Sequence, residues 1–261
     1  LTGVLGAQFP IKNFAPTFVW VIWWGGFIWL HILFGNSWNF VNPWKNIFEL
    51  IKFDEKPLRQ YPEKLKSWPA FGFFLIFAWI ELVYPTPAYP QFLGNIIFVY
   101  SVIVLAGMRV FGKDKWLDNC EPFTVFFNFV SSFSMTRVTS DGKILLRPIA
   151  SGLLDVRYRF DQLCFLILIL SVVSFDGLIS TLFWYDFIGI DVFGGSGRLD
   201  VIYVNTVGIL LSFIVFFSVF YSFVTIAKII TQTDITVVDL AQRFVPALLP
   251  ISIVYHLAHY S

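Results

Sequence analysis

Long apolar runs recur along this sequence, and polar segments separate them. An α-helix rises ~1.5 Å per residue, so a run of about 20 residues crosses the ~30 Å hydrocarbon core of a bilayer. Only 13% of the residues are charged, whereas soluble domains carry about 25%. The chain is therefore predicted to be an all-α integral membrane protein.

About six transmembrane helices are predicted. They cover residues 14–34, 68–84, 92–111, a stretch that begins after Asp161, 201–227 and 243–261. Residues 121–133 are too short to cross the core and predict a re-entrant or interfacial helix. Asp141-Gly142, between alternating polar and apolar residues, predicts a small cytoplasmic β-hairpin. We interpret residues 1–261 as a single transmembrane helical domain with cytoplasmic loops 35–67 and 112–160.

The basic residues predict the orientation of these helices. If the six spans alternate, 16 of the 18 Lys and Arg residues fall on one side, and only Lys12 and Arg198 fall on the other. Loops rich in Lys and Arg stay in the cytoplasm. The basic loops are therefore predicted to be cytoplasmic and the N-terminus to lie outside. Cys120 and Cys164 both fall on the cytoplasmic side, where a disulfide is not expected.

Acidic and imidazole side chains are predicted to meet in the outer half of the bilayer. Counting ~1.5 Å per residue from the cytoplasmic start of each span places Glu81, Asp176 and His256 roughly 20 Å into the core. His259 follows one turn later, and a spacing of three residues puts both imidazoles on one helix face. Asn205 enters from the outside at a similar level and is a candidate accessory residue. Polar side chains at this depth usually face a protein interior or a water-filled cavity.

This residue set allows two kinds of chemistry. Carboxylates and imidazoles bind zinc, copper or iron, and they also form proton relays. Structural interpretations stand beside both: Glu81 in the headgroup region, Asp176 capping a helix break, or His256 bonded to a neighbouring carbonyl. No nucleophile motif identifies a catalytic residue. Nucleic-acid binding is not expected, because the basic residues lie next to the membrane spans without aromatic residues suited to bases.

Several segments, read in order, resemble a known family. They are NFAPTFVWVIWW, LFGNSWNFVNPWKNI, YPEKLKSWPA, FAWIELVYP, GMRVFGKDKW, SFDG and AQRFVPALLPISIVYHLAHYS. Together they resemble the fenitrothion hydrolase-like family of polytopic bacterial and archaeal membrane proteins. The resemblance implies a prokaryotic cytoplasmic membrane and an organophosphate-ester hydrolase, and the matching segments include Glu81, Asp176, His256 and His259. The family's exported N-terminal segment and further spans are missing, so we expect a processed or partial chain.

Three functions remain open at this point. The first is an accessory or binding subunit of a membrane complex, with lipid and other membrane subunits as partners. The second is a membrane-embedded ester hydrolase, in which the four acidic and imidazole residues hold a metal ion that activates water. The third is a proton-coupled transporter that uses the same residues as a relay, although the sequence shows no internal repeat.

Overall fold

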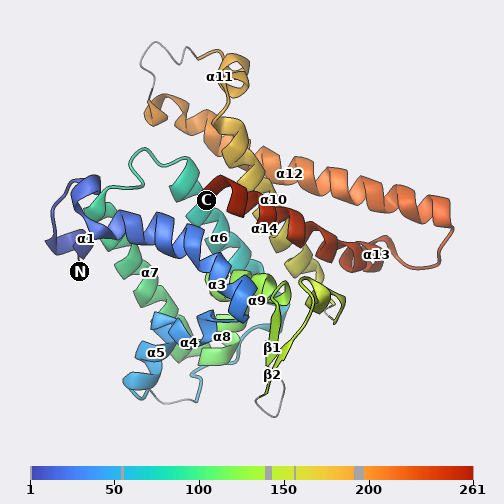
Figure 1. The fold of residues 1–261 in the computed structure, drawn as a ribbon, viewed down its shortest axis with the longest axis horizontal. Helices are drawn as coiled ribbons and strands as arrows, with labels where there is room; N and C mark the ends of the chain where they lie inside the picture. The colour runs from blue at the N-terminus through green and yellow to red at the C-terminus, as the bar shows by residue number, and fades with distance from the viewer. Residues whose placement is uncertain (1, 54–55, 139–142, 156, 191–196, 261) are drawn as a thin grey trace. The chain divides into compact units, whose positions relative to one another are not determined.

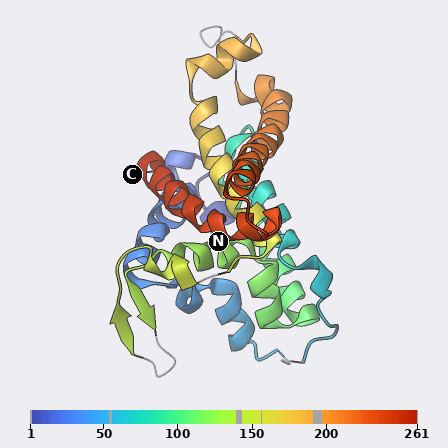
Figure 2. The same cartoon turned by 90° about the vertical axis from the view of Figure 1, so that its right-hand side faces the viewer.

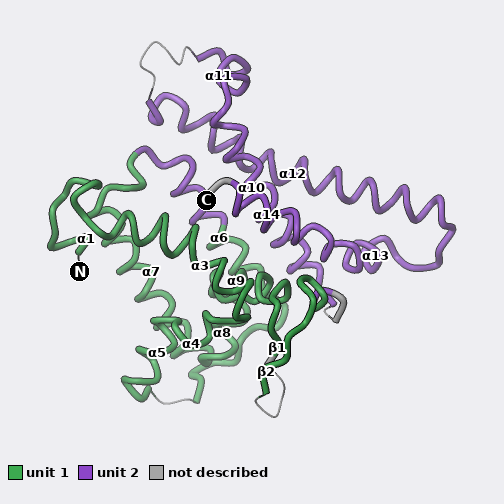
Figure 3. The backbone as a smooth tube through the Cα atoms, viewed as in Figure 1, with its two compact units in different colours: residues 1–74, 86–152, 260–261 green, residues 75–85, 153–259 purple. Residues whose placement is uncertain are grey.

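The structure, a computed structural model, is mostly helical (Figure 1). It describes residues 2–53, 56–138, 143–155, 157–190 and 197–260. The chain divides into two compact units (Figure 3): unit 1 comprises residues 1–74, 86–152 and 260–261, and unit 2 comprises residues 75–85 and 153–259. The prediction of a single transmembrane domain stays a prediction.

Among the residues that the structure describes, five helices are long and apolar enough to cross a membrane, as expected of an integral membrane protein. They are Phe14–Phe34, Pro90–Phe111, Phe160–Ile179, Arg198–Thr231 and Val237–Ala258. The predicted second span forms a shorter apolar helix, α6 (Trp68–Leu82). The fourth predicted span continues through Asp176 and Gly177 before it ends at Ile179, so the helix does not break at the SFDG motif.

Unit 1 contains the first and third predicted spans and several shorter elements. Its helices are α1 (Thr2–Leu5), η1 (Pro10–Lys12), α2 (Phe14–Pro16), the π-helical stretch η2 (Thr17–Gly26), α3 (Phe27–Phe34), α4 (Trp38–Val41), α5 (Pro43–Leu50), η3 (Glu63–Leu65), α7 (Pro90–Phe111), α8 (Lys113–Asn119) and α9 (Pro122–Ser132). Strands β1 (Thr136–Val138) and β2 (Ile144–Leu146) complete unit 1, and the short helix η4 (Ser151–Asp155) runs from unit 1 into unit 2.

The short helix α9 forms the core of unit 1. Eight of its eleven residues are buried, and its aromatic side chains pack against the first span. Trp23 meets Phe123 at 4.4 Å between ring centroids, and His31 stacks on Phe127 at 4.2 Å. The placement of α9 as a re-entrant or interfacial helix stays a prediction.

The chain reaches α9 by turning back along α7. The ring of Trp116 in α8 packs against Gly107, where an added Cβ would lie 2.1 Å from the indole. Tyr100, in the middle of α7, then bonds to Glu121 at the start of α9. α8 therefore runs back from the end of α7 towards its middle, and α9 follows from there.

The predicted hairpin is present as an antiparallel pair. Thr136 pairs with Leu146 and Val138 with Ile144, and the strands project from unit 1 (Figure 2). The Asp141-Gly142 turn lies outside the described residues. The structure thus confirms the strand pair, while its cytoplasmic location stays a prediction.

Unit 2 contains the later predicted spans and the end of α6. Its helices are α10 (Phe160–Ile179), α11 (Leu182–Ile188), α12 (Arg198–Thr231), α13 (Val237–Phe244), η6 (Val245–Ala247) and α14 (Leu248–Tyr260). The predicted sixth span is thus not one uniform helix: a 3₁₀ turn that contains Pro246 separates α13 from α14. Helix α12 is longer than the predicted span of 201–227 because it begins at Arg198 and continues to Thr231, where Gln232, in a left-handed conformation, caps it.

Candidate functional site

Residues of the predicted polar site lie in unit 2, on α6, α10 and α14. Helices α10 and α14 meet where Gly177 faces Tyr255: an added Cβ on the glycine would lie 2.1 Å from the tyrosine hydroxyl. Asp176 precedes this glycine and His256 follows this tyrosine in the sequence. The contact therefore brings the two helices together at the level of the predicted acid and imidazole.

Helix α6 runs antiparallel to α12. The Trp79 indole donates to the Thr206 hydroxyl at 2.9 Å. Further along α6, the Arg198 guanidinium donates to the carbonyls of Glu81 and Tyr84 at 2.9 and 3.1 Å. A basic side chain on the last carbonyls of a helix is a favourable C-terminal cap. Arg198 thus holds the backbone of the segment that carries the Glu81 side chain.

Helix α10 also runs antiparallel to α12. The Ser212 hydroxyl donates to the Ser171 carbonyl at 3.1 Å. Four residues later on α10, the Phe175 ring packs on Gly208, where an added Cβ would lie 2.7 Å from it. Only a residue without a side chain allows this close approach. These two contacts fix the register of the α10–α12 pair and place Asp176 beside the outer part of α12.

The two registers place Glu81 and Asp176 at a common level. With Trp79 opposite Thr206 and Phe175 opposite Gly208, the two acids lie beside positions on α12 that are about one helical turn apart, or ~5 Å along its axis. Both side chains are partly exposed. The two acids therefore lie at neighbouring levels of α12, and their matched depth in a bilayer stays a prediction.

The two histidines of α14 are not equally well described. His256 is 2% exposed, although it lies on a helix with exposed apolar neighbours such as Val254. His259 lies in the last turn of the same helix, and its side chain falls outside the described residues. A buried imidazole in an apolar helix is costly unless it serves packing, hydrogen bonding or a site.

Asn205 serves the packing of α11 on α12. Its side-chain oxygen accepts a hydrogen bond from the Trp184 indole at 2.9 Å, and both residues are buried. Trp184 in turn packs edge-on against Phe175, with ring centroids 5.6 Å apart. This arrangement gives Asn205 a structural role that the sequence did not suggest. The Phe175 ring, which Trp184 contacts, belongs to the residue just before Asp176.

The side-chain geometry shows no complete metal centre among the described residues. No group of three or more His, Cys, Asp and Glu side chains in that part of the chain is arranged to hold a metal ion. Structural and catalytic transition-metal sites in proteins use at least three protein ligands. A centre at this position would therefore need the His259 side chain in addition to described residues.

A second buried polar group lies in unit 1 and was not predicted. The Glu121 carboxylate is 0% exposed and accepts hydrogen bonds from the backbone N–H groups of Phe123 and Thr124 at 3.0 and 2.6 Å. It also accepts from the hydroxyls of Tyr100 and Thr124. We call these residues, with Trp38 and Asn42, whose side chains donate to the Thr124 hydroxyl, the Glu121 cluster.

The Glu121 cluster caps the start of α9. The first N–H groups of a helix have no partner within it, and the residues at this helix start are buried from water. The Glu121 carboxylate supplies acceptors for two of these groups, at the helix end where negative charge is favourable. The motif E-P-F-T offered a signal: an acid before a proline at the first helical position. Its distant partners could not be read from the sequence.

His31, the third histidine, belongs to the same packing layer. Its Nε2 accepts from the Trp38 backbone N–H at 3.1 Å, so its Nδ1 carries the proton and donates to the Phe27 carbonyl at 2.9 Å. Both ring nitrogens are therefore satisfied by backbone groups in a neutral imidazole. His31 connects α3 to α4 and has a structural role.

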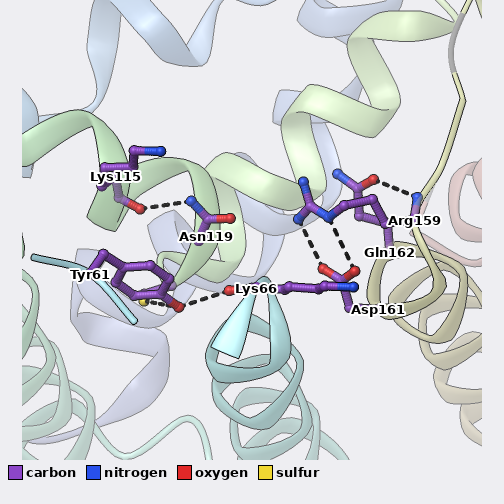
Figure 4. Close-up of polar contacts among 8 residues, drawn as sticks. Tyr61, Lys66, Lys115, Asn119, Arg159, Asp161 and Gln162 are labelled. Carbon is purple, nitrogen blue, oxygen red and sulfur yellow. Dashed lines mark hydrogen bonds and ion pairs between the residues drawn. The ribbon is translucent and has the colours of Figure 1, made fainter. Parts of the chain in front are cut away.

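In each unit, side-chain hydrogen bonds hold a loop near the predicted cytoplasmic side in place (Figure 4). In unit 1 the Tyr61 hydroxyl donates to the Lys66 carbonyl at 2.7 Å, and the Cys120 thiol donates to Tyr61 at 3.4 Å. Burial raises the pKa of Cys120 to about 11, while the Tyr61 contact lowers it, so the thiol stays neutral and unreactive. In unit 2 the Arg159 guanidinium forms a bidentate pair with Asp161 at 3.2 and 2.9 Å.

Comparisons with protein-family models, with curated proteins and with solved structures return no match. The resemblance to the fenitrothion hydrolase-like family therefore stays a prediction. The chemistry and the contacts of the residues themselves are the basis for assigning a function.

Proposed function

We propose that the chain is an accessory or binding subunit of a membrane complex, and that Glu81, Asp176, His256 and His259 bind a metal ion in the outer half of the bilayer. The observation that carries the proposal is the contact between Gly177 and Tyr255, which brings α10 and α14 together beside the buried imidazole of His256. Zinc, copper and iron are the candidate ions, because imidazole and carboxylate suit all three.

The subunit role is supported by the surface of the spanning helices. Apolar side chains are widely exposed on α7 and α12, including Phe98 at 69% and Phe223 at 69%. Such faces contact lipid or the helices of other membrane proteins. We propose that part of this surface binds partner subunits, with the N-terminus of the chain outside a prokaryotic cytoplasmic membrane.

Metal analysis of the purified chain tests the proposal. We expect stoichiometric zinc, copper or iron in the wild type and its loss in the double variant His256→Ala, His259→Ala. Ser252→Ala is the matched control, because Ser252 is buried on the same helix and donates only to the Leu248 carbonyl. A wild type without metal, or a double variant that retains it, would overturn the metal site.

Proton-coupled transport is the second candidate, and one observation favours it. A relay needs only an acid and an imidazole at one level, which Asp176 and His256 supply, whereas a metal centre needs a third ligand. Proton flux into proteoliposomes that is lost in Asp176→Asn, in a chain that binds no metal, would support transport. The ester-hydrolase alternative requires the metal, so a metal-free wild type would remove it as well.

A further inference from the structure

Tyr255 on α14 directs its side chain end-on at α10. An added Cβ on Gly177 would lie 2.1 Å from the Tyr255 hydroxyl, but 3.3 Å from the ring carbon that carries this hydroxyl. The Ser252 hydroxyl, one turn earlier on α14, donates to the Leu248 carbonyl. The Tyr255 hydroxyl, in contrast, forms no hydrogen bond within the part of the chain that the structure describes. A phenol is thus directed at α10 with its hydrogen-bonding capacity not used by these residues.

The same contact places the Tyr255 hydroxyl one residue away from Asp176. Asp176 directly precedes Gly177 on α10, and consecutive Cα atoms are ~3.8 Å apart. Asp176 is partly exposed, and Tyr255 is 38% exposed. A carboxylate and a phenol, both with exposed surface, therefore flank the point where α10 and α14 touch.

The spacing along α14 relates this tyrosine to the two histidines. Positions 255 and 259 are four residues apart, so they share one helix face, and position 256 lies ~100° further around the axis. Because Tyr255 meets Gly177, that face of α14 is turned towards α10. The buried residue His256 follows on the adjoining face. Tyr255 thus belongs to the same arc of α14 as the histidines of the proposed site.

A phenol adds a chemistry that carboxylates and imidazoles do not have. Loss of its proton gives a phenolate, a hard anionic oxygen that binds strongly charged ions, and tyrosine is the axial ligand of iron in some haem proteins. Zinc sites, in contrast, are built from Cys, His, Asp and Glu side chains. Two anionic oxygens, from Tyr255 and Asp176, therefore favour iron(III) or copper(II) among the candidate ions.

We propose that Tyr255 is a ligand of the metal ion, bound through its phenolate oxygen next to Asp176, and that the ion is iron(III) or copper(II) and not zinc. The phenol gives up its proton to water as the bond between oxygen and metal forms, so binding releases a proton. This role rests on the proposed metal site, to which it adds a ligand and the class of ion.

Absorption spectra of the full chain in detergent test this role. A phenolate bound to iron(III) or copper(II) gives a charge-transfer band in visible light, whereas a phenolate bound to zinc does not. The purified chain is loaded in turn with ferric citrate, cupric chloride and zinc chloride, and excess metal is removed. We expect the wild type to show the band with iron(III) or copper(II).

Tyr255→Phe keeps the ring and its packing but removes the oxygen. It should abolish the visible band and weaken binding of the same ion by about tenfold or more. Tyr203→Phe is the matched control, because Tyr203 is 84% exposed on α12, and it should change neither the band nor the affinity. Gly177→Ala places a methyl group where the hydroxyl lies, so it should reduce the band as well.

The outcomes separate the role of Tyr255 from the metal site itself. If the wild type binds only zinc, or if the band and the affinity persist in Tyr255→Phe, Tyr255 is not a ligand, although a metal site on the histidines can still stand. A wild type that binds none of the three ions overturns both. An unchanged band in Gly177→Ala would show that the hydroxyl does not act beside Gly177, which also contradicts the proposal.

Discussion

Glu121 in unit 1 and Asp176 in unit 2 are both carboxylates next to apolar helices, but their surroundings differ. Glu121 is 0% exposed and accepts four hydrogen bonds from protein donors, two of them from backbone N–H groups. Asp176 is partly exposed, on the last turns of α10, beside a close contact between helices. Glu121 is thus fully covered by protein, whereas Asp176 keeps part of its surface exposed.

This difference shows that a polar side chain at membrane depth is not by itself a functional site. Charged groups in a span are costly, and one way to offset that cost is to use the charge as a cap for backbone groups that water cannot reach. The Glu121 cluster does this. A candidate site therefore needs partly open acids or imidazoles, and unit 2 supplies them with Glu81 and Asp176.

The substitution Glu121→Ala should have the largest effect on stability. It leaves two backbone N–H groups and two hydroxyls without their acceptor in a buried position, and each unsatisfied group costs about 1–3 kcal/mol. We expect a loss of about 3 kcal/mol or more, measured as the unfolding free energy in mixed micelles. Glu63→Ala, at an exposed glutamate of η3, is the control and should change little. A stable Glu121→Ala variant would mean that the cap is dispensable.

Gly177→Ala should destabilise the α10–α14 contact by about 1–3 kcal/mol, because the new methyl group overlaps the Tyr255 hydroxyl. Adding Tyr255→Phe removes that hydroxyl and should restore most of the loss. The comparison of both single variants with the double variant measures the coupling between the two positions. If the losses simply add, the two helices do not meet at this point.

Asn205→Ala should cost about 1–2 kcal/mol, since the buried Trp184 indole loses its acceptor. Asn46→Ala is a suitable control, because that amide is exposed and bonds to the Phe40 carbonyl at the surface. Thermal unfolding with metal content measured in parallel separates two roles for Asn205. Lost metal at unchanged stability would identify it as an accessory ligand instead of a packing residue.

Glu49→Gln should have the smallest effect. The hydrogen bond from Lys113 lowers the pKa of Glu49, so the pair stabilises the fold above the ordinary carboxyl pKa and loses this effect as the pH falls through the lowered value. Exposed pairs of this kind contribute little, and salt screens them. We expect no measurable change in the unfolding midpoint at neutral pH. A clear drop would show that the pair is shielded from water.

The spans were predictable because membrane helices follow from hydropathy and length alone. The first span was predicted as 14–34 and is found as Phe14–Phe34. Helix boundaries that depend on local backbone conformation were harder to predict. Helix α12 extends to Thr231, and the last span is interrupted at Pro246. Neither feature leaves a strong mark in the apolar pattern, because proline is tolerated in membrane helices when neighbouring groups satisfy the backbone.

The candidate site was predictable only as far as depth. Counting residues predicted a common depth for Glu81 and Asp176, which stays a prediction. The partners of a side chain depend on how each helix is rotated about its axis. A helix that is apolar on all sides, as α10 is, does not specify this rotation in its sequence. The same limit hid the Glu121 cluster, whose donors come from Trp38, Tyr100 and Thr124, far apart in the chain.

The wide spacing of those donors has a consequence for biogenesis. Residues 38 to 124 must all have left the ribosome before the Glu121 cluster can close, so unit 1 cannot close span by span in order of synthesis. The first span and α7 must wait in the translocon or in lipid with the hydroxyl of Tyr100 and the indole of Trp38 unsatisfied. Insertion factors that shelter polar groups would therefore be expected to hold this chain until α9 arrives.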